Sequence, residues 1–187
     1  MDCISRNQLN VSNQMRMLWE QHVYWTRLLI ISILSDLKDE EETTKRLLRN
    51  PGDFGNLFGK FYGPRFQKTI TDLLTEHLVI GKELIVASKN GDTKEGERLN
   101  KLWYENADKM ARAFALVNPY YREEELRKML YTHLDLTKKE VALRLEGNYA
   151  EDVKNFDMIE QEALMMADYL TNGIVYHFPN RFNSRFV

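Results

Sequence analysis

Apolar side chains recur every three or four positions over five long stretches of the chain, at residues 13–37, 64–90, 93–117, 122–146 and 150–172. This spacing places them on one face of an α-helix. The stretches also end at helix signals: Pro64 opens the second, Asn118 and Pro119 close the third, and Gly91 and Gly147 follow two others. No β-strand alternation of convincing length occurs. The pattern therefore predicts an all-α fold, an up-and-down bundle of four to five long helices.

Residues 38–63 are predicted to form a long crossover between the first two helices. Its first half is expected to be a short surface helix, and its second half alternates four glycines with aromatic residues. We expect this half to be packed, because several of its side chains favour burial: Phe54, Leu57, Phe58, Phe61 and Tyr62. A phosphate-binding glycine loop is disfavoured, since no strand precedes it and no Gly-Lys-Ser/Thr follows. Residues 1–12 and 179–187 are expected to be tails of a single domain, 1–187.

Composition narrows the class of protein. The 187 residues suit one domain, and 43% hydrophobic with 29% charged residues is ordinary for a globular chain. The 26 basic and 28 acidic residues give a net charge of -2, which argues against a surface dedicated to nucleic acid.

The expected location is the cytoplasm. The longest apolar run, residues 28–34, is far shorter than the ~20 residues that span a bilayer. The first ten residues lack the apolar region of a signal peptide. The single cysteine, Cys3, rules out an internal disulfide and has no neighbour that would activate it as a catalytic thiol. We therefore expect no membrane partner.

One polar residue interrupts each apolar stripe near its middle. The five residues are His22, His77, Asn106, His133 and Glu160. Each lies within about three residues of the middle of its expected helix, which is roughly one helical turn. The middles of antiparallel helices meet at one level of a bundle. The sequence therefore predicts that His22, His77, His133 and Glu160 converge in the interior, with Asn106 nearby.

Three imidazoles and a carboxylate suit a transition metal ion such as zinc, iron, manganese or nickel, with a position left for water. A metal-bound water can become a nucleophile near neutral pH. Glu140 and Asp157 are the candidate catalytic residues, as proton carriers, and Thr26 and Thr137 follow two of the histidines by four positions. This hypothesis is a metal-dependent hydrolase, transferase or oxidoreductase acting on an unknown small molecule.

The alternative is a buried hydrogen-bond network in a structural or protein-interaction module, in which the histidines satisfy one another and Glu160. The metal hypothesis lacks a motif, since neither Glu-x-x-His nor His-Glu-x-x-His occurs.

His177 is expected to be solvated or to cap the last helix. A homodimer is plausible under either hypothesis, because the tryptophans and many other aromatic residues supply apolar surface.

The chain resembles a family of small bacterial helical proteins without an assigned activity. The resemblance covers about residues 17–182, includes His22, His77 and His133, and rests on LWEQHVYWTR, RLLRNPGDF, HLVI, NPYY, HLDLT, GNY, MMADYLTNGIV and FPNRF. Some such chains carry an acetylglutamate kinase label, but this sequence lacks the strand–glycine loop–helix unit that such phosphoryl transfer needs. In concept it is also similar to the DinB-like bundles, metal-binding hydrolases and thiol transferases with three histidines. It departs from them because no His-x-x-x-His pair lies on its last helix.

Overall fold

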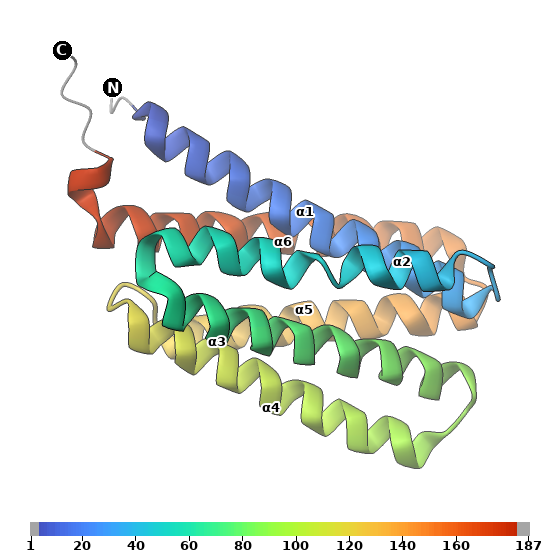
Figure 1. Ribbon diagram of the computed structural model, residues 1–187. Helices are drawn as coiled ribbons and strands as arrows, with labels where there is room; N and C mark the ends of the chain where they lie inside the picture. Colours follow the sequence, from blue (N-terminus) through green and yellow to red (C-terminus); the bar gives the residue numbers. More distant parts are fainter. Residues whose placement is uncertain (1–3, 183–187) are drawn as a thin grey trace.

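The computed structural model describes residues 4–182, and within that range the chain forms only helices and turns (Figure 1). The helices are α1 (Arg6–Leu34), α2 (Glu40–Leu47), α3 (Asn50–Lys89), α4 (Thr93–Val117), α5 (Glu123–Leu145), α6 (Tyr149–His177) and a short 3-10 helix, η1 (Pro179–Arg181). The predicted all-α class is confirmed. Cys3 lies outside the described residues, as do residues 183–187 of the predicted C-terminal tail.

Helix α3 is interrupted at Gly63, where the chain reverses direction (Figure 1). Gly63 has φ 83° and ψ 176°, a backbone conformation that side chains with a Cβ rarely adopt. Pro64 then begins the second segment, as predicted. The two segments of α3, residues 50–62 and 64–89, therefore run in opposite directions.

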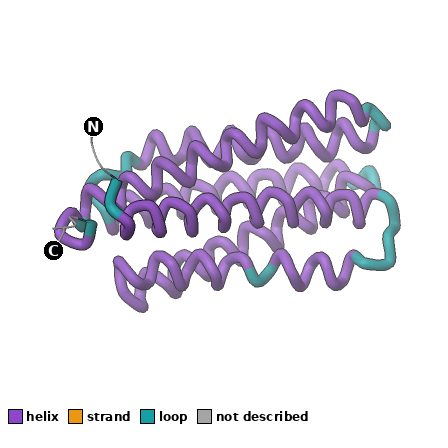
Figure 2. The backbone as a smooth tube through the Cα atoms, turned by 90° about the horizontal axis from the view of Figure 1, so that it is seen from above, coloured by secondary structure: helices purple, strands orange, loops and turns teal. Residues whose placement is uncertain are grey.

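The long helices form a closed ring of neighbours. Helix α1 packs on α6, α6 on α5, α5 on α4, α4 on α3, and α3 returns to α1. Figure 2 shows these helices side by side, with most of the connecting turns at the two ends of the bundle. The middles of the helices consequently share one level.

Two helix ends differ from the prediction. Helix α1 begins at Arg6, where the Ser5 hydroxyl accepts a hydrogen bond from the Gln8 amide at 3.2 Å, so residues 6–12 are not a loose tail. Helix α6 continues past Gly173 to His177. Gly173 does not end the helix. It leaves room for the ring of Tyr121, because a Cβ at position 173 would lie 1.9 Å from a carbon of that ring.

The predicted crossover is largely helical. Helix α2 is the short surface helix that the sequence indicated, and residues 50–62 form the first segment of α3. Phe54, Leu57 and Phe58 are buried, as expected from their apolar character.

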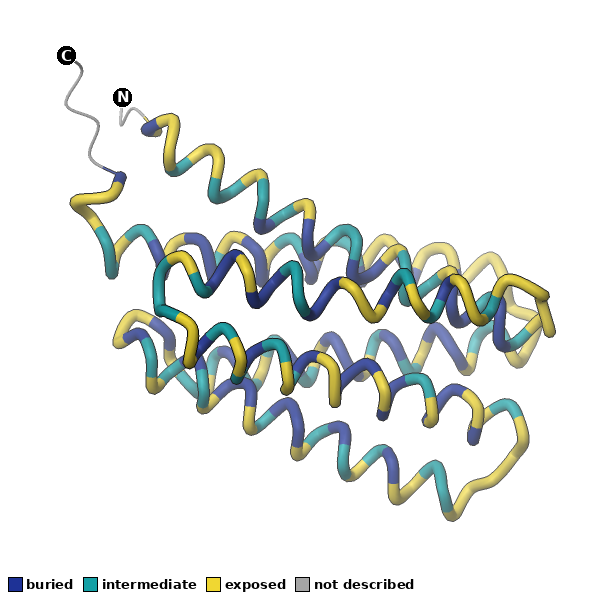
Figure 3. The backbone as a smooth tube through the Cα atoms, viewed as in Figure 1, coloured by how far each residue is buried: buried dark blue, intermediate teal, exposed yellow. Residues whose placement is uncertain are grey.

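The buried residues line the inner faces of the helices and fall into two clusters (Figure 3). The larger cluster contains the aromatic core, with Trp19, Phe54, Phe58, Phe66 and Phe114. The smaller is aliphatic and will be called the aliphatic cluster: Leu29, Ile30, Ile33, Leu47, Leu78, Ile85 and Val141. In residues 4–182, no helix reaches the length and apolar content that crossing a bilayer demands.

Candidate metal centre

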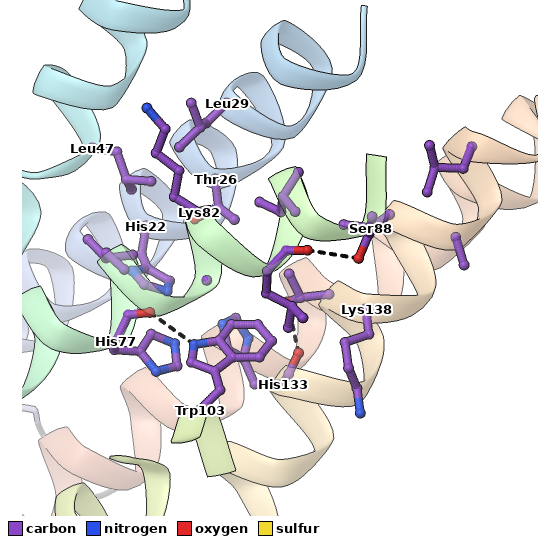
Figure 4. A pocket seen from close by; sticks show the side chains of 18 residues that line it. His22, Thr26, Leu29, Leu47, His77, Lys82, Ser88, Trp103, His133 and Lys138 are labelled. Carbon is purple, nitrogen blue, oxygen red and sulfur yellow. Dashed lines mark hydrogen bonds between the residues drawn. The ribbon is translucent and has the colours of Figure 1, made fainter. Parts of the chain in front are cut away.

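Three histidine rings meet in the middle of the bundle (Figure 4). His22 comes from α1, His77 from the second segment of α3 and His133 from α5, and each is only 3% exposed. Their ring centroids are 5.4–6.4 Å apart, and one nitrogen of each ring lies within 4.8 Å of the other two. The predicted convergence of the three rings is thus observed.

Each ring is held at Nδ1 by an oxygen from another part of the chain. Asn50 Oδ1 lies 3.1 Å from Nδ1 of His22, and Asn106 Oδ1 lies 3.2 Å from Nδ1 of His77. Glu162 Oε2 lies 3.2 Å from Nδ1 of His133. Five of these six side chains lie within about two residues of the middle of a long helix or, for His77, of the second segment of α3. They therefore sit at a common depth: His22, His77, Asn106, His133 and Glu162. Asn50, at the start of α3, reaches this depth through its contact with His22.

The hydrogen bonds of the two asparagines identify the protonated ring nitrogen. Nδ2 of Asn50 donates to the Leu18 carbonyl, and Nδ2 of Asn106 donates to the Leu73 carbonyl. A carbonyl only accepts, so in each amide Oδ1 must be the atom that faces the histidine. An amide oxygen also only accepts, and each Nδ1 must therefore carry a hydrogen. This leaves Nε2 with a free lone pair in both rings.

Two of the rings, His22 and His77, are neutral donors of lone pairs. Burial lowers the pKa of His22 to about 3, and the nearby His133 lowers it further while the Asn50 hydrogen bond opposes the shift. Burial likewise lowers the pKa of His77 well below its ordinary value, helped by His22 and His133. A metal ion binds the neutral imidazole, so these two rings are already in the required state at pH 7.

Two tryptophans fix the orientation of the rings. Trp103 stacks on His77 with centroids 5.1 Å apart, and its Nε1 donates to the His77 carbonyl at 2.9 Å. Trp19 packs edge-on against His22 and His133. Gly81 leaves the room that Trp103 occupies, because a Cβ there would lie 3.2 Å from its ring. The imidazoles are therefore held in place before any ligand arrives.

The prediction for Glu160 is wrong. Its carboxylate accepts a hydrogen bond from the Tyr24 hydroxyl at 2.9 Å, and it is not among the residues that converge with the rings. Glu162 is the buried carboxylate at this level, and it contacts Nδ1 of His133 at 3.2 Å instead of sharing the centre. Two residues along a helix turn a side chain by about 200°, which explains the different surroundings.

The candidate catalytic residues are also placed elsewhere. Asp157 is exposed on α6. Glu140 is buried but lies in an ion-pair network, where Arg27 contacts it at 2.5 Å and also bonds Asp152 at 2.8 Å, and Arg144 contacts Asp152 at 2.9 Å. Burial raises the pKa of Glu140 to about 7, against the lowering effect of Arg27. Neither carboxylate lines the cavity beside the rings.

A cavity of about 210 Å³ opens from the three rings into the aliphatic cluster (Figure 4). Thr26 and Thr137 both line it. The Thr137 hydroxyl donates to the His133 carbonyl at 2.8 Å, whereas the buried Thr26 hydroxyl has no hydrogen-bond partner among residues 4–182. The fourth histidine, His177, lies apart from the cavity and bonds Asn118 at 3.1 Å.

Asn50 and Glu162 were missed from the sequence. Asn50 precedes Pro51 in a segment whose pattern suggested a loop, and it does not interrupt an apolar stripe. Glu162 would have been chosen if the helix had been predicted to continue to His177, because it then lies closer than Glu160 to the middle of α6. Comparison with family models, curated proteins and solved structures found no match to this chain.

The arrangement creates a requirement at the centre of the three rings. No hydrogen bond joins one ring to another within residues 4–182, and one nitrogen of each ring faces a common point. One Lewis-acidic cation can accept a lone pair from each of three imidazoles. The centre is thus suited chemically to a metal ion.

Proposed function

We propose that the protein is a metal-dependent enzyme that binds one divalent transition metal ion through Nε2 of His22, His77 and His133. The observation that carries the proposal is that Nδ1 of each of the three rings is held by one oxygen atom. In metal sites, a hydrogen bond at the second nitrogen fixes the tautomer and orients the ring. Here all three rings have such a partner, and each partner comes from a different segment.

The distances support the proposal. An ion bound by nitrogens at about 2.1 Å in a tetrahedral arrangement separates those nitrogens by about 3.4 Å. The ring nitrogens are no more than 4.8 Å apart, so each needs to move inward by less than about 1 Å. Small rotations of the side chains supply such a shift without moving the helices.

Charge balance supports it as well. Glu162 is buried, its Oε2 contacts Nδ1 of His133, and its Oε1 has no partner among residues 4–182. A buried carboxylate without a nearby cation is costly. A divalent ion at the rings would offset this charge through His133, in the carboxylate–histidine–metal relay that is common in zinc sites.

The site is suited to Lewis-acid chemistry on a small molecule. Three neutral ligands leave the ion its full positive charge, and the cavity lies on the open side of the rings. When bound, the ion would polarise a carbonyl or lower the pKa of a water. Trp19 and Trp103 exclude other solvent from two sides. The reaction classes that this supports are hydrolysis and group transfer.

The alternative, a structural network, finds less support. It required the histidines to bond one another and Glu160, and none of these bonds is present in residues 4–182. A network that served only stability would leave the Thr26 hydroxyl and Glu162 Oε1 without partners among residues 4–182.

Metal analysis tests the proposal directly. Protein purified without a nickel column is expected to carry, or to take up, about one equivalent of zinc, iron or manganese. His77→Ala is expected to abolish this uptake, whereas His177→Ala, a matched change at a histidine bonded elsewhere, is expected to retain it. Circular dichroism establishes that both variants are folded.

Thermal melting adds a second measurement. An ion that binds only the folded state at about 100 times its Kd stabilises it by about 2.7 kcal/mol, so added metal should raise the melting temperature and a chelator should reverse this. A folded wild-type protein that refuses zinc, iron and manganese, with an unchanged melting temperature, would overturn the proposal.

A further inference from the structure

The cavity beside the rings has a buried end and an open end. On α3 its lining runs from His77 to Ser88, and on α5 from His133 to Leu145, which is roughly 16–18 Å at 1.5 Å per residue. The rings are buried, whereas Ser88 and Leu145 are exposed. The cavity therefore forms a channel from the candidate metal centre to the surface.

The walls of this channel are aliphatic. Five of the seven members of the aliphatic cluster line it: Leu29, Leu47, Leu78, Ile85 and Val141. An apolar enclosure of this kind favours hydrocarbon over water. The channel is therefore suited to a ligand with an apolar part.

The polar groups of the wall are already paired, except at the buried end. Lys82 contacts Glu40 at 3.0 Å, and Lys138 contacts Asp135 at 3.1 Å. Figure 4 shows the ammonium groups of both lysines turned away from the histidine rings, so their methylene chains form the wall. At the buried end, one nitrogen of each ring faces a common point, and the Thr26 hydroxyl has no partner among residues 4–182. A ligand's polar group therefore belongs at the rings and its apolar part toward the opening.

The volume sets the size of the apolar part. An apolar cavity of about 150 Å³ binds benzene, a molecule of six carbons. The channel here has about 210 Å³. In proportion, it accommodates about eight carbons.

We propose that this channel binds medium-chain acyl compounds, with the carbonyl or acid head at the metal and a chain of about eight carbons along the aliphatic wall. The inference rests on the proposed function, since the head is held by the ion. Thr26 also lines this end of the channel.

The experiment compares two hydroxamates that share a metal-binding head and differ in chain length. Protein loaded with zinc, with the metal content measured first, is titrated with acetohydroxamate and with octanohydroxamate by calorimetry. The longer probe is expected to bind roughly 3,000-fold more tightly, because it buries six additional methylene groups. The affinity should stop increasing beyond about ten carbons, where the chain reaches solvent.

Val141→Phe tests the position of the chain. Its larger ring would fill part of the channel, so the preference for octanohydroxamate should fall at least tenfold while the metal content and the affinity for acetohydroxamate stay unchanged. Val153→Phe is the matched control, because Val153 is exposed on α6 outside the channel, and it should behave as wild type.

The outcomes separate the two proposals. Equal affinity of zinc-loaded wild-type protein for the two hydroxamates would overturn the chain-binding proposal and leave the metal site intact. Failure of the folded protein to take up zinc, iron and manganese would overturn both. The wild-type chain-length series decides the matter even where Val141→Phe does not fold.

Discussion

The two isoleucines Ile70 and Ile85 lie on the same segment of α3 but in differently built parts of the core. Ile70 is fully buried in the larger cluster, near the level where Phe58, Phe66 and Phe114 pack with centroids 5.0–6.0 Å apart. Ile85 belongs to the aliphatic cluster and lines the channel. One part of the bundle is filled, and the other is built around a space.

This difference shows how stability and binding can be separated within one bundle. Edge-to-face aromatic pairs add stabilisation beyond their buried area, and they leave little room. Outside the lining of the channel, Arg27 and Arg144 form buried ion pairs with Glu140 and Asp152 that link α1, α5 and α6. The three rings lie between the filled and the hollow part.

The largest expected effect on stability comes from replacing an isoleucine by alanine in the filled part, compared with the same change in the hollow part. Ile70→Ala should lower the free energy of unfolding by about 4 kcal/mol, near the upper end for such changes, because it opens a new cavity among packed neighbours. Ile85→Ala should cost about 2 kcal/mol, because one side of Ile85 already faces the channel and fewer contacts are lost. Urea unfolding measures both. Equal costs would contradict the division into a filled and a hollow part.

The next effect concerns pH. The pKa of Glu140 is raised from 4.5 to about 7, so the folded state binds this proton more tightly than the unfolded state. Glu140 thus adds stability at low pH, which is lost as the pH rises from about 4.5 to 7. A shift of this size corresponds to roughly 3 kcal/mol. Glu140→Gln should remove this fall, as measured by urea unfolding between pH 4.5 and 8.

The comparison between the two proteins isolates Glu140, because all other titrating groups are common to both. An equally steep pH dependence in Glu140→Gln would show that the burial of this carboxyl does not control the stability around the channel. Arg27 keeps its bonds to Asp152 in the variant.

The smallest effect concerns the support of the rings. Asn106→Leu removes the oxygen that holds Nδ1 of His77, and it should weaken metal binding by 10- to 100-fold. Asn155→Leu is the control, because Asn155 is equally buried but donates to the Leu136 carbonyl and contacts no ring. Competition with a fluorescent chelator measures both affinities. An equal loss in the two variants would indicate a general effect of packing.

The sequence predicted the helices and the meeting of the rings because both follow from periodicity. Each histidine interrupts an apolar stripe, and a polar residue inside a stripe is visible without coordinates. The depth of each histidine followed from the positions of the helix ends, and errors of several residues at those ends changed the depth by about one and a half turns at most.

The face of α6 was harder to predict, because polar residues occupy much of its buried side. Asp152 and Asn155 are polar residues on the buried side: Asp152 pairs with Arg27 and Arg144, and Asn155 donates to a carbonyl of α5. Burial of such groups depends on partners distant in sequence, which periodicity does not reveal. The same limitation explains why Glu160 was chosen over Glu162.

The six side chains of the candidate centre are distributed over every long helix. His22 is on α1, Asn50 and His77 are on the two segments of α3, and the remaining three belong to α4, α5 and α6. Each histidine lies 28 or 29 residues from the oxygen that holds it. No fragment that omits one of these helices can contain the full set. Ion uptake would therefore report whether the whole bundle has assembled.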